Sequence, residues 1–259
     1  YRNIAIGSNA LNSTGTNAQT GTIAIGYEAL TALTSGAKNT AIGYDAMGDA
    51  LQSYNNVAIG YESLNALAGD DINNAGGNNI AIGVDSMGSL NAGVHGSARA
   101  NMNIAIGTSA FLAGSMADSS ASVSQGNVCI GHEAAMTTGT NAQVGITAIG
   151  HRALKALTTG AGNTAIGYQS LDATTTGASN TMVGYQTGTA LPAGGDGNTA
   201  VGYQALLGGN HDNTHENTVI GYQTGQQIST GFNNTLIGAN VDVATGSFDN
   251  VTAIGNNFE

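Results

Sequence analysis

The sequence predicts an all-β protein, a parallel β-solenoid of about 14 coils that forms one repeat domain over residues 1–259. A short phrase, a β-branched residue followed by Ala-Ile-Gly, recurs along the whole chain. Its copies lie 17–24 residues apart, which leaves no room for a long helix, a strand and two loops in each copy. The composition agrees, with 40 glycines, a single proline and only 8% charged residues.

The glycine that closes each phrase fixes the register of the repeat. The residue before it is Ile in 12 copies and Val in two, and the residue four positions before it is Asn in 11 of 14. A larger duplication lies over this pattern, because residues 13–47 and 137–171 align without gaps and share 23 of 35 positions. The 14 anchor glycines are Gly7, Gly26, Gly43, Gly60, Gly83, Gly107, Gly131, Gly150, Gly167, Gly184, Gly202, Gly221, Gly238 and Gly255.

Each copy contains one short predicted strand. β-Branched side chains suit a pleated surface, so the three residues before the glycine are expected to be extended. The Asn tolerates left-handed geometry and bonds nearby backbone, so it suits a turn, and stacked coils would align these asparagines in a ladder. We therefore expect two short strands and two turns in each coil.

The predicted strand is apolar on both faces, with Ile and its β-branched partner on one side and Ala on the other. Such a strand is typical of a sheet that is covered on both faces. One face closes the coil, and the sequence offers no helix to cover the other. We therefore expect the chain to assemble with copies of itself along its length, with this stacked core: Ile6, Ile25, Ile42, Ile59, Ile82, Ile106, Ile130, Ile149, Ile166, Val183, Val201, Ile220, Ile237 and Ile254.

Two further rows follow from the register. An aromatic row directly follows the glycine and is expected to pack from coil to coil, or to expose rings for sugars; it comprises Tyr27, Tyr44, Tyr61, Tyr168, Tyr185, Tyr203 and Tyr222. A threonine row, on the same face as the Ile row, comprises Thr164, Thr181, Thr199, Thr218, Thr235 and Thr252. A flat Thr/Tyr face suggests an alternative function, a monomeric solenoid that binds ice or carbohydrate.

The phrases "NTAIGYQSL", "NNVAIGYESL" and "NNIAIGVDSM" resemble the head repeats of trimeric autotransporter adhesins, the YadA-like family. The form with Tyr-Gln-Ala-Leu after the glycine is similar to repeats of phage tail-fibre proteins. The resemblance implies a left-handed β-roll in a homotrimeric fibre, and a structural and adhesive role in attachment to a host cell or surface. It implies an extracellular place, on a cell surface or a virion, and a receptor or glycan as a possible partner.

Charge and composition exclude several classes of function. Five scattered Lys and Arg residues in a chain of net charge −11 give no basic surface for nucleic acid. No apolar run approaches the roughly 20 residues of a transmembrane helix, so we expect no direct membrane insertion of this segment. The single Cys129 replaces an Ala of the strand and is expected to be buried. No catalytic residue and no cofactor site is predicted. The third hypothesis is an enzyme such as a polysaccharide depolymerase, with a carboxylate pair such as Asp70 and Asp71 in its active site.

The candidate ligand sites are weak. His211 and His215, beside Asp212 and Glu216, could bind a metal, but a solvated polar loop is the preferred interpretation, because an irregular loop does not place both imidazoles on one face as a helix would. A row two residues after the glycine could hold calcium or simply face solvent; it comprises Glu28, Asp45, Glu62, Asp85 and Glu133, and becomes Gln169, Gln186, Gln204 and Gln223 further on. His132 and His151 take the Tyr position of two adjacent copies, with an ion pair expected nearby. The longer loops 68–79, 88–102 and 113–126 are the predicted receptor contacts.

Overall fold

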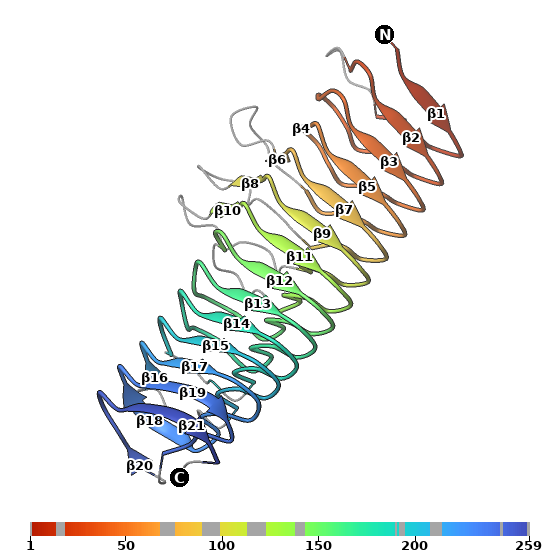
Figure 1. Cartoon of the computed structure of the whole chain (residues 1–259). Coiled ribbons are helices and arrows are strands. Elements are labelled where there is room, and N and C mark those ends of the chain that lie inside the picture. The colour runs from red at the N-terminus through yellow and green to blue at the C-terminus, as the bar shows by residue number, and fades with distance from the viewer. Residues whose placement is uncertain are drawn as a thin grey trace. The chain divides into compact units, whose positions relative to one another are not determined.

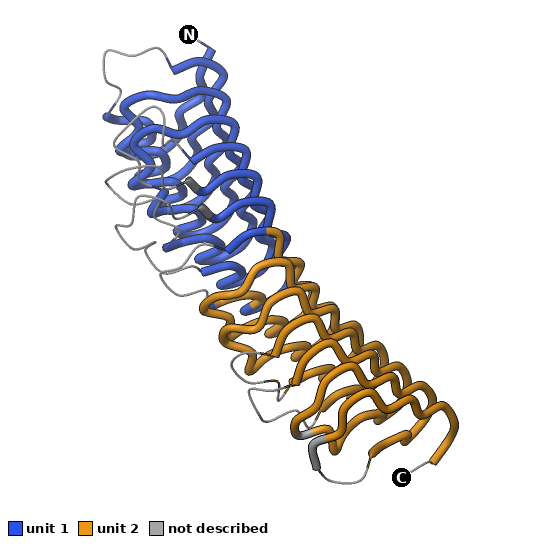
Figure 2. Tube along the Cα trace, turned by 90° about the vertical axis from the view of Figure 1, so that its left-hand side faces the viewer, with its two compact units in different colours: residues 1–133, 137–144 blue, residues 134–136, 145–259 orange. Residues whose placement is uncertain are grey.

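The computed structural model describes residues 2–13, 19–67, 76–89, 99–112, 123–137, 143–189, 191, 195–207, 214–243 and 246–257. They fall into two compact units, residues 1–133 with 137–144 and residues 134–136 with 145–259 (Figure 2). Strands and turns make up each unit, and no helix occurs among the described residues. The predicted parallel β-solenoid is confirmed as the fold (Figure 1).

The main sheet of the first unit contains seven parallel strands in the described residues. Successive strands pair without slippage, so that Ile23 lies opposite Thr40 and Ala24 opposite Ala41. The order follows the chain: β1 (Ile4–Ile6), β2 (Ile23–Ile25), β3 (Thr40–Ile42), β5 (Val57–Ile59), β7 (Ile80–Ile82), β9 (Ile104–Ile106) and β11 (Val128–Ile130).

The second unit repeats this design with seven described strands. Its first strand position is always threonine, and each threonine lies opposite the next. The strands are β12 (Thr147–Ile149), β13 (Thr164–Ile166), β14 (Thr181–Val183), β15 (Thr199–Val201), β17 (Thr218–Ile220), β19 (Thr235–Ala239) and β21 (Thr252–Asn256).

The second strand that we expected in every coil forms in only some of the described coils. In the others the equivalent residues form no strand, as at 177–178 before β14. The first unit has β4 (Ser53–Tyr54), β6 (Gly76–Gly77), β8 (Arg99–Asn101) and β10 (Val123–Gln125), and the second has β16 (Thr214–His215), β18 (Ile228–Phe232) and β20 (Gly246–Ser247).

A tight corner follows each main strand, and the anchor glycine begins it. Gly43 has φ +143°, and a Cβ there would overlap the carbonyl oxygen of Gly60 in the next coil. Two later residues of the corner are also left-handed, as at Asp45 (φ 53°) and Met47 (φ 54°). Left-handed geometry costs an L-residue about 1–2 kcal/mol. In return, Met47 donates its backbone N–H to Ser63 at 3.0 Å, which joins the two coils.

The interior of each coil is filled from two sides. The middle strand residue points inward, and Ala58 and Ala81 are fully buried. The left-handed residue four places after the glycine, such as Leu64 or Met87, is also fully buried. Large corner side chains thus complement small strand side chains, in the dense packing that protein interiors require.

Candidate interaction surfaces

The outer face of each main sheet carries the first and third residue of every strand. In β7 the flanking Ile80 and Ile82 are half-buried while Ala81 between them is fully buried. All 14 residues of the predicted stacked core lie at this third position and are partly exposed, from half-buried to 70% exposed at Ile254. No described strand or turn covers this face in either unit. The sequence left open which face lies outside; the structure places Ile there and Ala inside.

The outer faces of the two units differ chemically. In the first unit, six of the seven first positions are Ile or Val; Thr40 is the other. In the second unit all seven are threonine, because Thr147 extends the predicted threonine row by one. Apart from Thr40, the first unit therefore presents an apolar outer face, and the second unit alternates a hydroxyl row with an Ile/Val row.

A ladder of asparagine side chains runs inside each unit. Each of these asparagines directly precedes the first residue of a main strand. Asn79 donates its backbone N–H and its Nδ2 to Asn56 Oδ1, at 2.9 and 3.1 Å. Its second Nδ2 hydrogen reaches the carbonyl of Ala100 at 2.8 Å. Asn103 then donates to Asn79 Oδ1 in the same way. Each amide is buried and satisfied, as burial of a polar group requires. These residues hold the coils together and are not open to a ligand.

The tyrosines that follow the anchor glycines stack into two columns. The first tyrosine column is Tyr27, Tyr44 and Tyr61, with ring centroids 5.1 Å apart. The second tyrosine column is Tyr168, Tyr185, Tyr203 and Tyr222, with ring centroids 5.2 Å apart and planes within 11° of parallel; His151 stacks on Tyr168 at its beginning.

Each of these tyrosines is exposed by 42–52%. Within a column the neighbouring rings occupy the ring faces. The columns therefore present ring edges and hydroxyls to solvent, whereas sugars stack on ring faces. This geometry weighs against the hypothesis that the tyrosine row binds carbohydrate.

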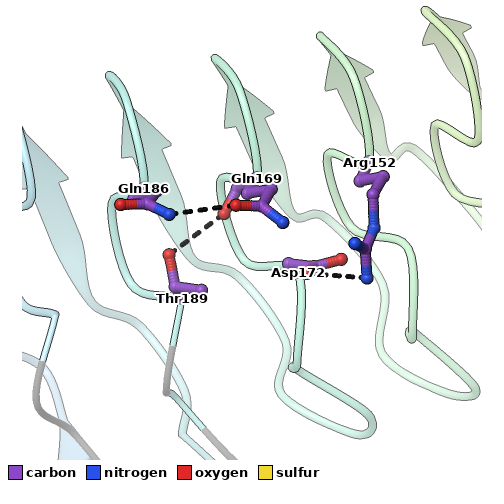
Figure 3. Close-up of polar contacts among 5 residues, drawn as sticks. All are labelled: Arg152, Gln169, Asp172, Gln186 and Thr189. Atoms are coloured by element: carbon purple, nitrogen blue, oxygen red, sulfur yellow. Dashed lines mark hydrogen bonds and ion pairs between the residues drawn. The ribbon is translucent and has the colours of Figure 1, made fainter.

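The glutamines two residues after the anchor glycines of the second unit form a glutamine column, of which Figure 3 shows Gln169 and Gln186. Gln186 donates to Gln169, Gln204 to Gln186 and Gln223 to Gln204, each from Nε2 to Oε1 at 3.0 Å. Thr189 donates to the carbonyl of Gln169 at 3.1 Å.

Nearby, the ion pair expected beside His151 joins Arg152 to Asp172, at 3.2 Å between Nη2 and Oδ2. It bridges two successive coils. The glutamine column and the Arg152–Asp172 ion pair both join successive coils, so neither marks a ligand site.

In the first unit the same position holds a carboxylate column, Glu28, Asp45, Glu62 and Asp85. Burial raises the pKa of Asp45, and the nearby carboxylates Asp49, Glu28 and Glu62 raise it further. Burial likewise raises the pKa of Asp85, assisted by the charge of Glu62. Both effects disfavour the charged form. At this position the carboxylates of the first unit repel one another, whereas the glutamines of the second unit hydrogen-bond to one another.

The structure gives the metal candidates no support. Among the described residues no three His, Cys, Asp or Glu side chains gather to hold a metal ion. His211 lies outside the described residues, and His215 Nδ1 accepts the backbone N–H of Asp196 at 3.2 Å. Cys129 is fully buried, and burial raises the pKa of its thiol far above the ordinary value. It is therefore an inert core residue.

Most of each predicted receptor loop lies outside the described residues, namely 68–75, 90–98 and 113–122, and so does the pair Asp70 and Asp71. None of the described residues forms a helix of the length and apolarity needed to cross a bilayer.

No family model, no curated protein and no solved structure matched the chain.

Proposed function

We propose that this chain is a structural and adhesive segment of an extracellular homotrimeric fibre, a left-handed β-roll of about 14 coils that attaches a cell or virion to a surface. One observation carries the proposal: the outer sheet face of each unit is rich in β-branched side chains that remain partly exposed to solvent in the described residues. Covering a half-exposed Ile contributes on the order of 1 kcal/mol. Repeated from coil to coil, that gain favours assembly along the length of the chain.

A threefold assembly suits this face and the adhesive role. Three copies can turn the same face toward one axis, so each covers the others with no additional domain. The trimer would also present three copies of every loop, which multiplies weak contacts with a surface. The resemblance to adhesin heads and tail fibres supports the choice of three copies.

Light scattering coupled to size exclusion tests the assembly. The expected mass is three times 25.6 kDa. Changing Ile82 and Ile106 together to Lys places charges on the outer face and is expected to give folded monomers. Asn9→Lys, at an exposed turn, is the matched control and should leave the trimer intact. A folded wild-type chain that stays monomeric at all concentrations contradicts the proposal.

The threonine row of the second unit favours one alternative, a monomer that binds ice. Seven hydroxyl-bearing side chains repeat at the strand spacing of about 4.8 Å on a flat face. Ice and partner chains would compete for this same face. Measurement of thermal hysteresis on the monomeric fraction therefore separates the two: ice binding requires the face to be free, and the trimer requires it to be covered.

A further inference from the structure

The two tyrosine columns bring phenol rings into a repeated, nearly parallel arrangement that the stack itself does not require. Ring centroids lie 5.1 Å apart in the first tyrosine column and 5.2 Å apart between tyrosines of the second. Successive rings are related by one coil. Because the rings are nearly parallel, equivalent ring carbons of neighbouring tyrosines also lie about 5 Å apart.

The rings are also accessible to solvent. Each is exposed by 42–52%, so an oxidant can reach its edge and hydroxyl. Exposed side chains change rotamer in picoseconds to nanoseconds. A modest rotation of two neighbouring rings can therefore bring their ortho carbons into bonding range without moving the backbone.

We propose that the tyrosine columns are oxidative cross-linking sites, where tyrosines of successive coils couple to dityrosine and lock the coils covalently. Each phenol loses one electron to the oxidant and one proton to solvent, which gives a phenoxyl radical. Two radicals join through a carbon–carbon bond between ring carbons ortho to oxygen. The hydrogens on those carbons leave as protons, and both phenoxyl oxygens regain a proton.

The net change is the loss of two electrons and two protons for each cross-link. A peroxide, acting through a peroxidase, is the class of oxidant that would accept them: its O–O bond breaks and two waters form. The site needs no cofactor in the chain itself, because register alone selects the partners. The coupling does not depend on the proposed trimer, since both rings of each pair belong to one chain.

Photo-oxidation of the native protein with a ruthenium sensitiser and persulfate tests the proposal, with persulfate reduced to sulfate. Dityrosine fluorescence should appear while the chain keeps its single-chain mass on a denaturing gel. Cleavage before Asp172, Asp196 and Asp212 puts the four tyrosines of the second column on separate peptides. Mass spectrometry should then find only neighbouring pairs linked: 168 with 185, 185 with 203, and 203 with 222.

Variants make the test specific. Tyr185→Phe keeps an aromatic ring in the stack but removes two of the five Tyr–Tyr contacts, so dityrosine should fall by about two-fifths. The link between 203 and 222 should survive. Tyr54→Phe, in β4 outside both columns, should change nothing. The proposal is overturned if no dityrosine forms, if links involving Tyr54 are as frequent, or if links join separate chains predominantly.

Discussion

At the scale of the residue, the buried amide ladder sets how firmly one coil holds the next. The ladder is interrupted at Thr22, which occupies an Asn position between Asn3 and Asn39. Its backbone N–H still donates to Asn3 Oδ1 at 3.1 Å. Its hydroxyl is buried without a hydrogen-bond partner among the described residues. Thr22 therefore leaves a polar group unsatisfied, whereas Asn79 and Asn103 bond on both sides.

We expect Thr22→Asn to stabilise the protein. The new amide would accept the backbone N–H and Nδ2 of Asn39 and complete the ladder toward Asn3. The gain should be about 1–2 kcal/mol in the free energy of unfolding, measured by urea titration. An unchanged or lower midpoint would show that side-chain length, and not the missing amide, limits this position.

Asn103→Ala is the opposite change. It removes the Nδ2 bond to Asn79 Oδ1, the Nδ2 bond to the carbonyl of Ser124, and the Oδ1 acceptor for Asn127, while the backbone N–H of residue 103 can still donate to Asn79 Oδ1. We expect a loss of roughly 2–4 kcal/mol in the same titration, because buried polar groups lose their partners. Asn9→Ala, at an exposed amide 3.5 Å from Glu28, should cost at most about 1 kcal/mol, because only the left-handed backbone at φ 59° favours Asn over Ala there.

The anchor glycines can be tested with a pair of Gly→Ala variants. Gly43→Ala adds a Cβ against the backbone of Gly60, at a φ that L-residues avoid, and should cost on the order of 3 kcal/mol. Gly126→Ala also has positive φ, +68°, but nothing lies within 4 Å of the added Cβ. It should cost only about 1 kcal/mol. Equal thermal shifts would contradict the role we assign to the close approach of backbones.

At the scale of the element, the carboxylate and glutamine columns occupy equivalent corners with opposite energetics. The side chain of Gln186 both donates to Gln169 and accepts from Gln204. A carboxylate at such a corner can donate only when it is protonated. The first unit is therefore expected to gain stability when Asp45 and Asp85 take up protons.

The direction of the pH dependence of stability follows from the raised pKa of Asp85. Between its unfolded and folded pKa values, the folded chain binds more protons than the unfolded chain, so this group's contribution to stability falls as pH rises through that window. Asp85→Asn removes the titration. The variant should melt above wild type at neutral pH, and the difference should shrink as pH falls toward the ordinary aspartate value of 3.8. Calorimetry at several pH values measures this; a constant difference would rule the effect out.

Most of each element could be predicted from the sequence, but its corner could not. Ala58 and Ile59 indicate the strand, because β-branched and small residues alternate about a fixed glycine. The left-handed backbone of Glu62 and Leu64 carries no such signal, since neither residue type prefers that geometry. It arises from backbone bonds to neighbouring coils, such as Glu62 N–H to the carbonyl of Tyr44 at 2.9 Å. The inward role of Leu64 follows from that backbone, so register alone did not reveal it.

At the scale of the whole molecule, assembly should make stability depend on concentration. If three chains fold and associate together, the melting temperature rises with protein concentration by mass action. We expect such a rise for wild type over a hundredfold dilution series of about 0.1–10 μM. The Ile82→Lys/Ile106→Lys variant should lose it. A concentration-independent melting temperature for wild type would argue for the monomeric alternative.

The amide ladder has one more consequence, for how such a chain changes in length. Every rung has the same polarity, so any segment that begins at one Asn and ends just before the next presents identical donors and acceptors to its neighbours. Such a segment behaves as an interchangeable cassette that can be copied or deleted without leaving a broken rung. The near-copy of residues 13–47 at 137–171 is what a past copying event would leave. Length thus becomes a heritable quantity that recombination can adjust in whole steps.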